Sequence, residues 1–210
     1  MSESKYEKVN LEEWNRSDAY LFYKSYSDPL FNITANVPTT RLYHYCKETK
    51  SSFFLNSLFY SLQAANAVPE FRLRLLENDL VVFENICVGS TILRSDNSFC
   101  FCYFDYTKDK EVFLKNGEES INLAKNTKNL EPKKGVVDII FHSVVPWISF
   151  TSIKHARNEG KMDSIPKIVF GKYFQQGDEW MLPVSVEANH AMMDGFHVGQ
   201  YFNNLEKLIG

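Results

Sequence analysis

Apolar and polar positions recur along this chain with two different periods, and these periods predict its strands and helices. From residue 31 to residue 37 apolar and polar side chains alternate, which is typical of a strand with one face in water. Between residues 52 and 68 apolar side chains recur every three or four positions, which predicts a mostly buried helix. The same helical spacing from Phe196 to Ile209 predicts a helix near the C-terminus.

Two other helices are expected from shorter patterns. The first covers residues 20–23, and Ser17 or Asp18 stands before it as a candidate N-cap. The second is amphipathic and covers residues 109–124. Gly117 is its weak point, because glycine lowers the stability of a helix interior.

Runs rich in β-branched and aromatic residues predict the remaining strands, over residues 71–75, 80–83, 98–104, 136–141, 167–174 and 180–188. Short turns should join the first two of these strands and the last two into hairpins. Arg72 and Arg74 are expected on one face of the first strand. Residues 131–135 should form a polar loop that is too short to mark a domain boundary. Strands and helices mixed in this order predict one domain over residues 1–210, of the α/β (α+β) class with a mixed sheet.

Composition and charge exclude several classes of protein. With 44% hydrophobic and 15% aromatic residues, the chain can bury a substantial core. A net charge of −3 offers no basic surface for nucleic acid. The first residues contain no apolar segment of the kind that a signal peptide requires, and no run reaches membrane-spanning length. A soluble, cytoplasmic protein is therefore expected.

The four cysteines, Cys46, Cys87, Cys100 and Cys102, include no Cys-x-x-Cys pair. Cys100 and Cys102 occupy alternate positions of a predicted strand, so their side chains should point to the same face. Reduced, buried thiols in a cytosolic protein are favoured over a zinc site.

His190 is the strongest candidate for chemistry. It follows the predicted strand 180–188 and precedes the last helix, so it should lie on a short loop that presents it to a cleft. Neutral histidine accepts a proton, which makes His190 a candidate general base, although a packed and hydrogen-bonded side chain explains the same position. Asp194 could orient the site or supply a negative charge to it, or it could cap the following helix. A third interpretation takes His190, Asp194 and His197 as metal ligands, without a strong metal spacing to support it.

Ser143 is the second candidate, because it lies near the end of a predicted strand before a Pro-Trp step. Its hydroxyl could stabilise an oxyanion, but serine at such a place is also a common turn residue. The chain has no glycine-rich phosphate loop and no Gly-x-Ser-x-Gly elbow. The residues by themselves support a histidine-based enzyme site.

The motif at His190 is one of several motifs along the chain whose order matches that of a known family. They are Trp14-x-Arg16, Phe22-Tyr23, Phe31-x-Ile33-Thr34, Phe71-Arg72-x-Arg74, Ser143-x-x-Pro146-Trp147-x-x-Phe150, Lys172-Tyr173-x-x-Gln176-Gly177-Asp178, Leu182-Pro183-Val184-Ser185 and His190-x-x-x-Asp194-Gly195-Phe196-His197. Together they resemble the chloramphenicol acetyltransferases over nearly the whole chain. The resemblance implies a two-layer subunit of the CoA-dependent acyltransferase fold, assembled as a homotrimer with active sites at subunit interfaces and without a metal.

The resemblance also implies a mechanism. His190 would remove a proton from a hydroxyl of a small acceptor, with chloramphenicol the leading one, and the oxygen would attack the thioester of acetyl-CoA. Ser143 would donate a hydrogen bond to the oxyanion of the intermediate. Asp194 would pair with Arg16 and hold the His190 loop.

Binding positions follow from the resemblance in the same way. Tyr23 and Phe31 match positions that line the acceptor pocket of the family. Trp147, Lys172 and Tyr173 match the region that contacts CoA.

Two positions depart from the family pattern. Asn189 replaces the first of two consecutive histidines, and Val169 replaces a threonine that often supports the intermediate through water. The alternatives that stay open are the same chemistry on another small alcohol or amine, and a non-catalytic trimer that binds CoA or a small ligand.

Overall fold

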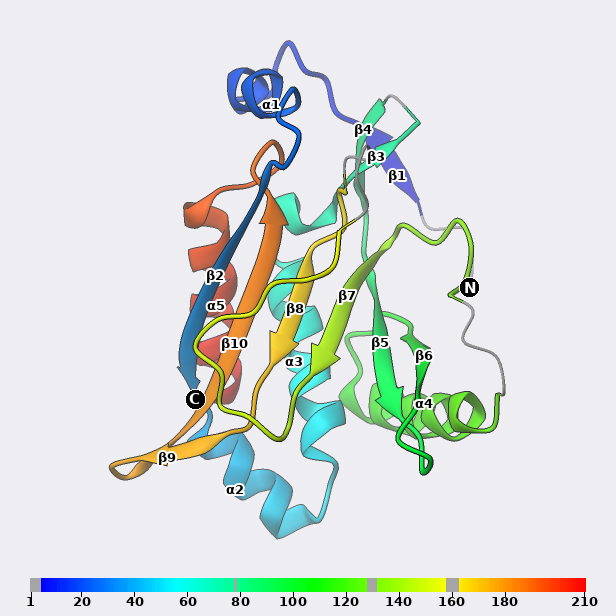
Figure 1. Cartoon of the computed structure of the whole chain (residues 1–210), viewed down its shortest axis with the longest axis vertical. Helices are drawn as coiled ribbons and strands as arrows, with labels where there is room; N and C mark the ends of the chain where they lie inside the picture. The colour runs from blue at the N-terminus through cyan, green and yellow to red at the C-terminus, as the bar shows by residue number, and fades with distance from the viewer. Residues whose placement is uncertain (1–4, 78, 128–131, 158–162) are drawn as a thin grey trace.

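A computed structural model describes residues 5–77, 79–127, 132–157 and 163–210 of the chain (Figure 1). Asn78 and Glu131, which belong to the predicted hairpin turn and polar loop, lie outside these residues. The elements are β1 (Tyr6–Lys8), α1 (Ser17–Tyr23), β2 (Leu30–Pro38), α2 (Thr40–Thr49), α3 (Phe53–Asn66), the 3-10 helix η1 (Pro69–Arg72), β3 (Leu73–Leu76), β4 (Asp79–Phe83), β5 (Cys87–Leu93), β6 (Phe99–Phe104), α4 (Lys110–Lys125), β7 (Ile139–Val144), β8 (Lys167–Phe170), β9 (Phe174–Gln176), β10 (Glu179–Asn189) and α5 (Gly195–Ile209).

Most of the strands form one mixed sheet of seven, in the order β2-β10-β8-β7-β5-β6, with β9 paired to β10. The strand β7 runs parallel to β5 and β8, whereas β10 is antiparallel to β2 and β8. A second sheet contains β1, β4 and β3. Figure 1 shows α3, α4 and α5 behind the large sheet, while the segment after β7 crosses its front face. The predicted α/β class with a two-layer mixed sheet is confirmed.

The helical layer is held by apolar side chains at the predicted spacing. In α3, Leu58 and Leu62 are fully buried, and Ser52 caps the helix by accepting a hydrogen bond from the N–H of Leu55 at 3.2 Å. A Cβ atom at Gly117 of α4 would lie 2.8 Å from the Leu55 side chain. This glycine therefore permits α4 to approach α3, in addition to weakening its own helix.

The start of α1 differs from the prediction. Its N-cap is Arg16, and neither Ser17 nor Asp18 caps it. The hydroxyl of Ser17 instead donates a hydrogen bond to the carbonyl of Trp14 at 2.8 Å, within the preceding turn. Ser17 is the first residue inside the helix and does not precede it, so its hydroxyl bonds back to the preceding turn and does not cap the helix.

Arg72 and Arg74 do not share a strand face, because Arg72 lies in η1 and only Arg74 lies in β3. Arg72 donates to the carbonyls of Phe83 and Glu84. Arg74 is fully buried and donates to main-chain carbonyls of Phe71, Leu73, Val137 and Ile139. Both side chains satisfy backbone groups where the small sheet meets the large one.

Other boundaries moved, and some elements were not predicted. The strand expected over residues 136–141 is β7, and the one expected over residues 167–174 divides into β8 and β9 around Gly171. The elements α2 and β5 had no counterpart in the prediction. All four cysteines are free, and Cys100 and Cys102 are buried on one face of β6, as expected. Within the described part of the chain, no helix is both long and apolar enough to cross a membrane.

Candidate active site

His190 lies in a tight turn between β10 and α5, as the sequence predicts. The carbonyl of Asn189 accepts hydrogen bonds from the N–H groups of Met192 and Met193 at 3.0 and 3.1 Å, which closes the turn. The N–H of His190 donates to the carbonyl of Pro29 at 2.8 Å. The main chain of His190 is thus fixed to the segment that leads into β2.

The imidazole of His190 is held by aromatic rings. Tyr23, the last residue of α1, stacks on it with centroids 4.2 Å apart and planes 8° apart. Phe31 lies on it at 4.7 Å and 40°. The Nδ1 atom of His190 is buried and has no hydrogen-bond partner among the described residues. The ring is therefore oriented by packing, and no carboxylate among the described residues forms an ion pair or hydrogen bond with it.

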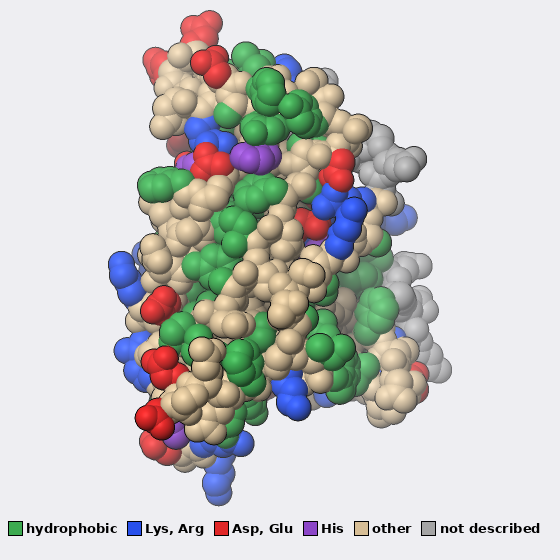
Figure 2. Space-filling model, turned by 60° about the vertical axis from the view of Figure 1, so that its left-hand side comes forward, with side chains coloured by type: hydrophobic (Ala, Val, Ile, Leu, Met, Phe, Trp, Pro, Cys, Tyr) green, Lys and Arg blue, Asp and Glu red, His purple; other side chains and the backbone are tan. Residues whose placement is uncertain are grey.

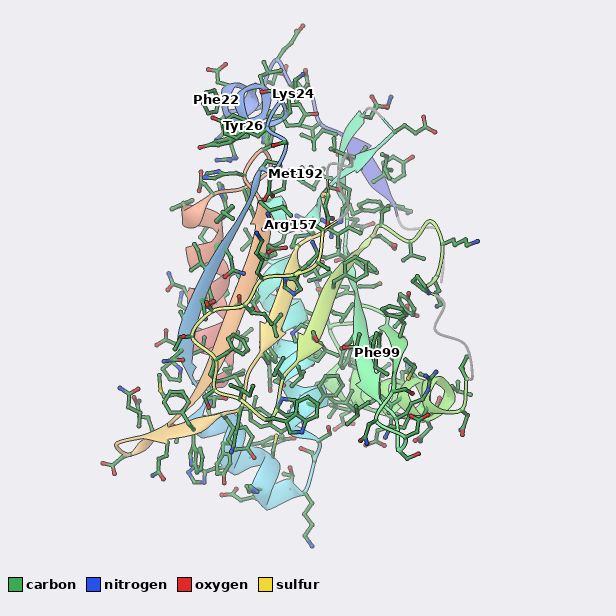
Figure 3. The ribbon with its side chains drawn as sticks, in the orientation of Figure 1. Phe22, Lys24, Tyr26, Phe99, Arg157 and Met192 are labelled. Carbon is green, nitrogen blue, oxygen red and sulfur yellow. The ribbon has the colours of Figure 1, made fainter. Side chains whose placement is uncertain are left out.

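Hydrophobic side chains are also exposed around this end of the molecule. Leu21, Phe22 and Tyr26 have exposed fractions of 49%, 58% and 46%. Figure 2 shows hydrophobic side chains gathered near a histidine over α1 and the end of β10, and Figure 3 shows Phe22 and Tyr26 beside each other. An exposed aromatic group beside a histidine is suited to contact with a ligand or another subunit.

Asp194 both caps α5 and pairs with Arg16. Its Oδ1 accepts a hydrogen bond from the N–H of Phe196 at 2.9 Å, and its Oδ2 pairs with Nη1 of Arg16. Burial by itself would raise the pKa of the Asp194 carboxyl, but the Phe196 N–H and the Arg16 charge lower this pKa below its usual value. Nη2 of Arg16 also donates to the carbonyl of His190 at 3.4 Å. Arg16 and Asp194 thus brace the turn from both ends.

His197 completes the cap of α5. Its Nδ1 accepts the N–H of Asp194 at 3.2 Å, and its Nε2 lies 3.4 Å from Oε1 of Glu70. In the described part of the chain, no group of three or more His, Cys, Asp or Glu side chains is arranged to hold a metal ion. The contacts of His197 are those of a helix-capping residue.

Asn189, one of the two departures, is nearly fully buried and uses both ends of its amide. Its Nδ2 donates to the carbonyl of Asp163 at 2.9 Å, and its Oδ1 accepts the N–H of Ala191 at 2.9 Å. The amide therefore joins the turn of His190 to the segment before β8. The other departure, Val169, is fully buried in β8.

Ser143 lies elsewhere in the same chain. It is paired across the sheet with Val169, and Val169 is paired with Ser185 of β10. His190 comes five residues after Ser185, which corresponds to about 16 Å along the strand in addition to about 10 Å across two strand spacings. Figure 1 shows β7 and β10 running in opposite directions, so their C-terminal ends lie far apart. The structure does not bring Ser143 and His190 together within one chain.

Thr91 is a neighbour of Ser143 that the sequence did not indicate. Its hydroxyl oxygen lies 3.3 Å from that of Ser143, and either group can donate. If Thr91 donates, the Ser143 hydroxyl is left with its own proton for an incoming oxyanion. The pairing of β5 with β7 places these two residues together, and a contact that depends on strand pairing leaves no local pattern in the sequence.

The three residues expected to contact CoA lie near one another at the α2 end of the molecule. The N–H of Lys172 donates to the carbonyl of Ile148 at 2.9 Å, next to Trp147, which is 63% exposed. Tyr173 packs on Phe53 with ring centroids 5.1 Å apart. A cavity of about 290 Å³ adjoins it and is lined by Tyr43, Cys46, Lys47, Lys50, Ser51, Phe53 and Tyr173. Its two lysines were not predicted, because α2 itself was not.

A charged cluster around Glu187 of β10 was also not predicted from the sequence. Glu187 is buried among Arg157, Lys167 and His155. The signal that could have revealed it is the spacing of Ser185, Glu187 and Asn189, three polar residues at alternate positions of a mostly apolar strand.

Comparison with known proteins places these features in a family. A family model described as chloramphenicol acetyltransferase matches residues 4–206. A chloramphenicol acetyltransferase of Escherichia coli is 27% identical over 205 residues, which are 96% of this chain and 93% of that protein. One of Proteus mirabilis is 28% identical over 200 residues, which are 95% and 92% of the two chains.

Solved structures show the same fold. A chloramphenicol acetyltransferase structure superposes with a TM-score of 0.93 at 23% identity and covers 98% of this chain and 100% of that one. The cubic core of the pyruvate dehydrogenase multienzyme complex superposes with a TM-score of 0.64 at 13% identity, over 97% of this chain and 89% of that one. At these identities the superpositions establish the architecture alone.

Proposed function

The chain belongs to the chloramphenicol acetyltransferase family of acyltransferases, and on that premise we propose that it transfers the acetyl group of acetyl-CoA to a hydroxyl of chloramphenicol. The observation that carries the proposal is the turn of His190, where the motif shared with the family is folded around a packed imidazole. Residues 1–210 would form one subunit. The protein would act in the cytoplasm, where acetyl-CoA is available.

His190 would act as the general base. Its neutral imidazole would accept the proton of the acceptor hydroxyl while the oxygen attacks the thioester carbonyl. The tetrahedral intermediate would then collapse with cleavage of the C–S bond, and the leaving CoA thiolate would take the proton from the imidazolium of His190. Contact with Tyr23 and Phe31 supports this role, because two aromatic walls restrict the ring without adding a charge to it. Arg16 and Asp194 would be positioning residues, since their contacts are with the main chain of the turn and the helix cap.

Ser143 would donate a hydrogen bond to the oxyanion of the tetrahedral intermediate. Because Ser143 and His190 lie far apart in one chain, the site would be assembled from two chains, with His190 of one facing Ser143 of the next. A ring of three subunits repeats such a head-to-tail contact and closes it. The separation of the two residues along β7 and β10 supports this homotrimer.

Acetyl-CoA would approach from the end of the chain that carries Trp147, Lys172 and Tyr173. The cavity beside Tyr173 supports this route, because aromatic walls suit an adenine ring and the lysines 47 and 50 suit phosphate groups. The acceptor would enter from the other end, beside Tyr23 and Phe31. The two substrates would then meet between the base and the oxyanion donor.

A second acceptor is favoured by one specific observation. Val169 is fully buried between Ser143 and Ser185, so it interrupts a row of hydroxyl groups that also includes Thr34 and Thr91. An apolar side chain there can hold no water for the intermediate, which distinguishes this site from one with threonine. The same chemistry on another small alcohol or amine is therefore the second candidate.

Release of free CoA from acetyl-CoA, followed with a thiol reagent, tests the proposal. The protein should release CoA when chloramphenicol is added, and His190→Ala should lower the rate of that release by about 10²–10⁴. Release with another alcohol or amine, but not with chloramphenicol, would support the second candidate. A folded trimer that releases no CoA with any acceptor of such a panel would refute the enzymatic function and leave a trimer that binds CoA or a small ligand.

A further inference from the structure

The strand that carries the base has a buried carboxylate close to its end. Glu187 precedes His190 by three residues, and its side chain is 1% exposed. Nη2 of Arg157 donates to its Oε2 at 3.2 Å, while Oε1 lies 3.4 Å from Nζ of Lys167 and 3.5 Å from Nδ1 of His155. A carboxylate removed from water requires partners of this kind.

These partners keep Glu187 charged. Burial by itself would raise the pKa of the Glu187 carboxyl, but His155, Arg157 and Lys167 outweigh burial and lower this pKa to about 2. At neutral pH the guanidinium of Arg157 is therefore held against a full negative charge. This fixes one end of Arg157 on β10.

Arg157 also reaches a second carboxylate from the opposite side. Its Nη1 pairs with Oδ2 of Asp28, in the segment between α1 and β2. One residue further on, the carbonyl of Pro29 accepts the N–H of His190, and Phe31 lies against the imidazole. Figure 3 shows Arg157 below Met192, near the end of β10. One guanidinium thus joins the strand that carries the base to the segment that covers it.

We propose that Arg157 is a positioning residue for His190. Arg157 acts by holding the segment around Asp28 at a fixed distance from Glu187. The inference rests on the proposed function, in which His190 is the general base. Arg157 touches neither the imidazole nor a reacting atom. Its planar fork engages one carboxylate with each terminal nitrogen, which the single ammonium of a lysine does with less geometric control.

The first test measures the imidazole without any acetyl transfer. Diethyl pyrocarbonate acylates accessible, neutral histidines, and peptide mass spectrometry resolves the rate at each one. His44 is exposed on α2 and serves as the internal reference. Removing the bridge should raise the rate at His190 relative to His44 by about two- to fivefold, the change in local opening expected for a partly exposed ion pair.

The variants are Arg157→Ala, Asp28→Asn and the matched control Arg94→Ala. Arg94 also joins two segments, since it donates to the carbonyls of Phe99 and Thr127, but it lies at the β5–β6 hairpin. It should leave the ratio unchanged. If Arg157→Ala fails to fold, Asp28→Asn still tests the proposal. The Asp28 side chain is 49% exposed, and its replacement removes only the pair between Arg157 and Asp28.

The second test separates positioning from general stability. Arg157→Ala and Asp28→Asn should lower kcat with chloramphenicol and leave the KM for acetyl-CoA unchanged, and Arg157→Lys should recover part of the rate. An unchanged labelling ratio in both Arg157→Ala and Asp28→Asn would overturn the proposal. A raised His190/His44 labelling ratio in a protein that transfers no acetyl group would support the Arg157 bridge and refute the proposed function. Failure of the bridge and failure of the proposed function are therefore distinguishable.

Discussion

The ring of Tyr23 lies parallel to the imidazole of His190, with their centroids 4.2 Å apart. Tyr23 ends α1, whereas His190 follows β10, so this contact joins distant parts of the chain at the proposed base. A flat stacked pair limits rotation of the imidazole and keeps its nitrogen atoms aimed in one direction. The orientation of the His190 ring therefore depends on a residue far from it in sequence.

Replacing Tyr23 should separate the effect of stacking from that of the hydroxyl. Tyr23→Ala should lower kcat about two- to tenfold, since an aromatic pair contributes about 0.5–1.5 kcal/mol beyond its buried area. Tyr23→Phe keeps the ring and should retain most of the activity. Steady-state kinetics of CoA release measure both. Equal losses in the two variants would assign the effect to the hydroxyl instead.

A site shared between two chains should be restored by mixing two inactive variants. His190→Ala should lower the rate by about 10²–10⁴ and Ser143→Ala by about 10²–10³. When the two are co-expressed equally, about a quarter of the interfaces in a cyclic trimer combine an intact base with an intact serine. Activity should return to that fraction of the wild-type rate.

The matched control mixes His190→Ala with a chain that carries both substitutions, which can form no intact interface. Native mass spectrometry establishes that the mixed trimers exist. Mixed trimers without any recovered activity would contradict a site assembled from two chains.

Removing Arg16 should affect turnover and leave cofactor binding intact. Arg16→Ala loses the pair with Asp194 and the hydrogen bond to the carbonyl of His190. Hydrogen bonds to charged groups contribute about 1.5–3 kcal/mol, so kcat should fall by roughly ten- to a hundredfold. Calorimetry should give an unchanged Kd for CoA. A collapse of CoA affinity with normal turnover would show that the proposed bracing role is wrong.

Asn189→Ala should destabilise the fold through the turn. It leaves the carbonyl of Asp163 and the N–H of Ala191 without their partner, and two hydrogen bonds of about 1 kcal/mol each predict a loss of about 2 kcal/mol. Urea unfolding measures the change. Asn126→Ala, which removes an exposed amide from the end of α4, should cost much less. Equal stability of the two variants would contradict the bridging role of Asn189.

The stability of the protein should fall in mild acid because of His142. This residue of β7 is buried, and neither ring nitrogen has a hydrogen-bond partner among the described residues. Burial lowers the pKa of His142 to about 3, from an ordinary value of 6.5. The unfolded chain therefore binds a proton below pH 6.5 that the folded chain refuses, so stability falls as the pH decreases, by up to about 1.4 kcal/mol per pH unit.

Urea unfolding between pH 7.5 and pH 5 measures this slope, and His142→Val should flatten it. This pH range lies above the ordinary pKa of Glu187, 4.5, so protonation of Glu187 does not contribute to the slope. His44→Ala, which changes an exposed histidine, should leave the slope as it is. The same slope in His142→Val would exclude His142 as its cause.

The sequence by itself determined the elements on either side of His190. The strand β10, the turn at His190 and the helix α5 were predicted from periodicity, because the apolar face of a strand or helix is repeated by residues that are near in sequence. Capping by Asp194 was one of the two roles that the sequence left open for this residue, and a cap is also local because it bonds N–H groups two or three residues on. The helix α2 was not predicted, because its buried face consists of only Leu42 and Cys46.

The tertiary structure alone decided what surrounds His190. Arg16 meets Asp194, and Arg157 joins Asp28 to Glu187, across long stretches of sequence. No period in the sequence records such pairs, because they depend on which strands are neighbours and in which register. Register also sets Ser143 level with Ser185 and so separates it from His190. The motif at His190 is local and could be read from the sequence, whereas the proposed division of the site between two chains rests on strand order.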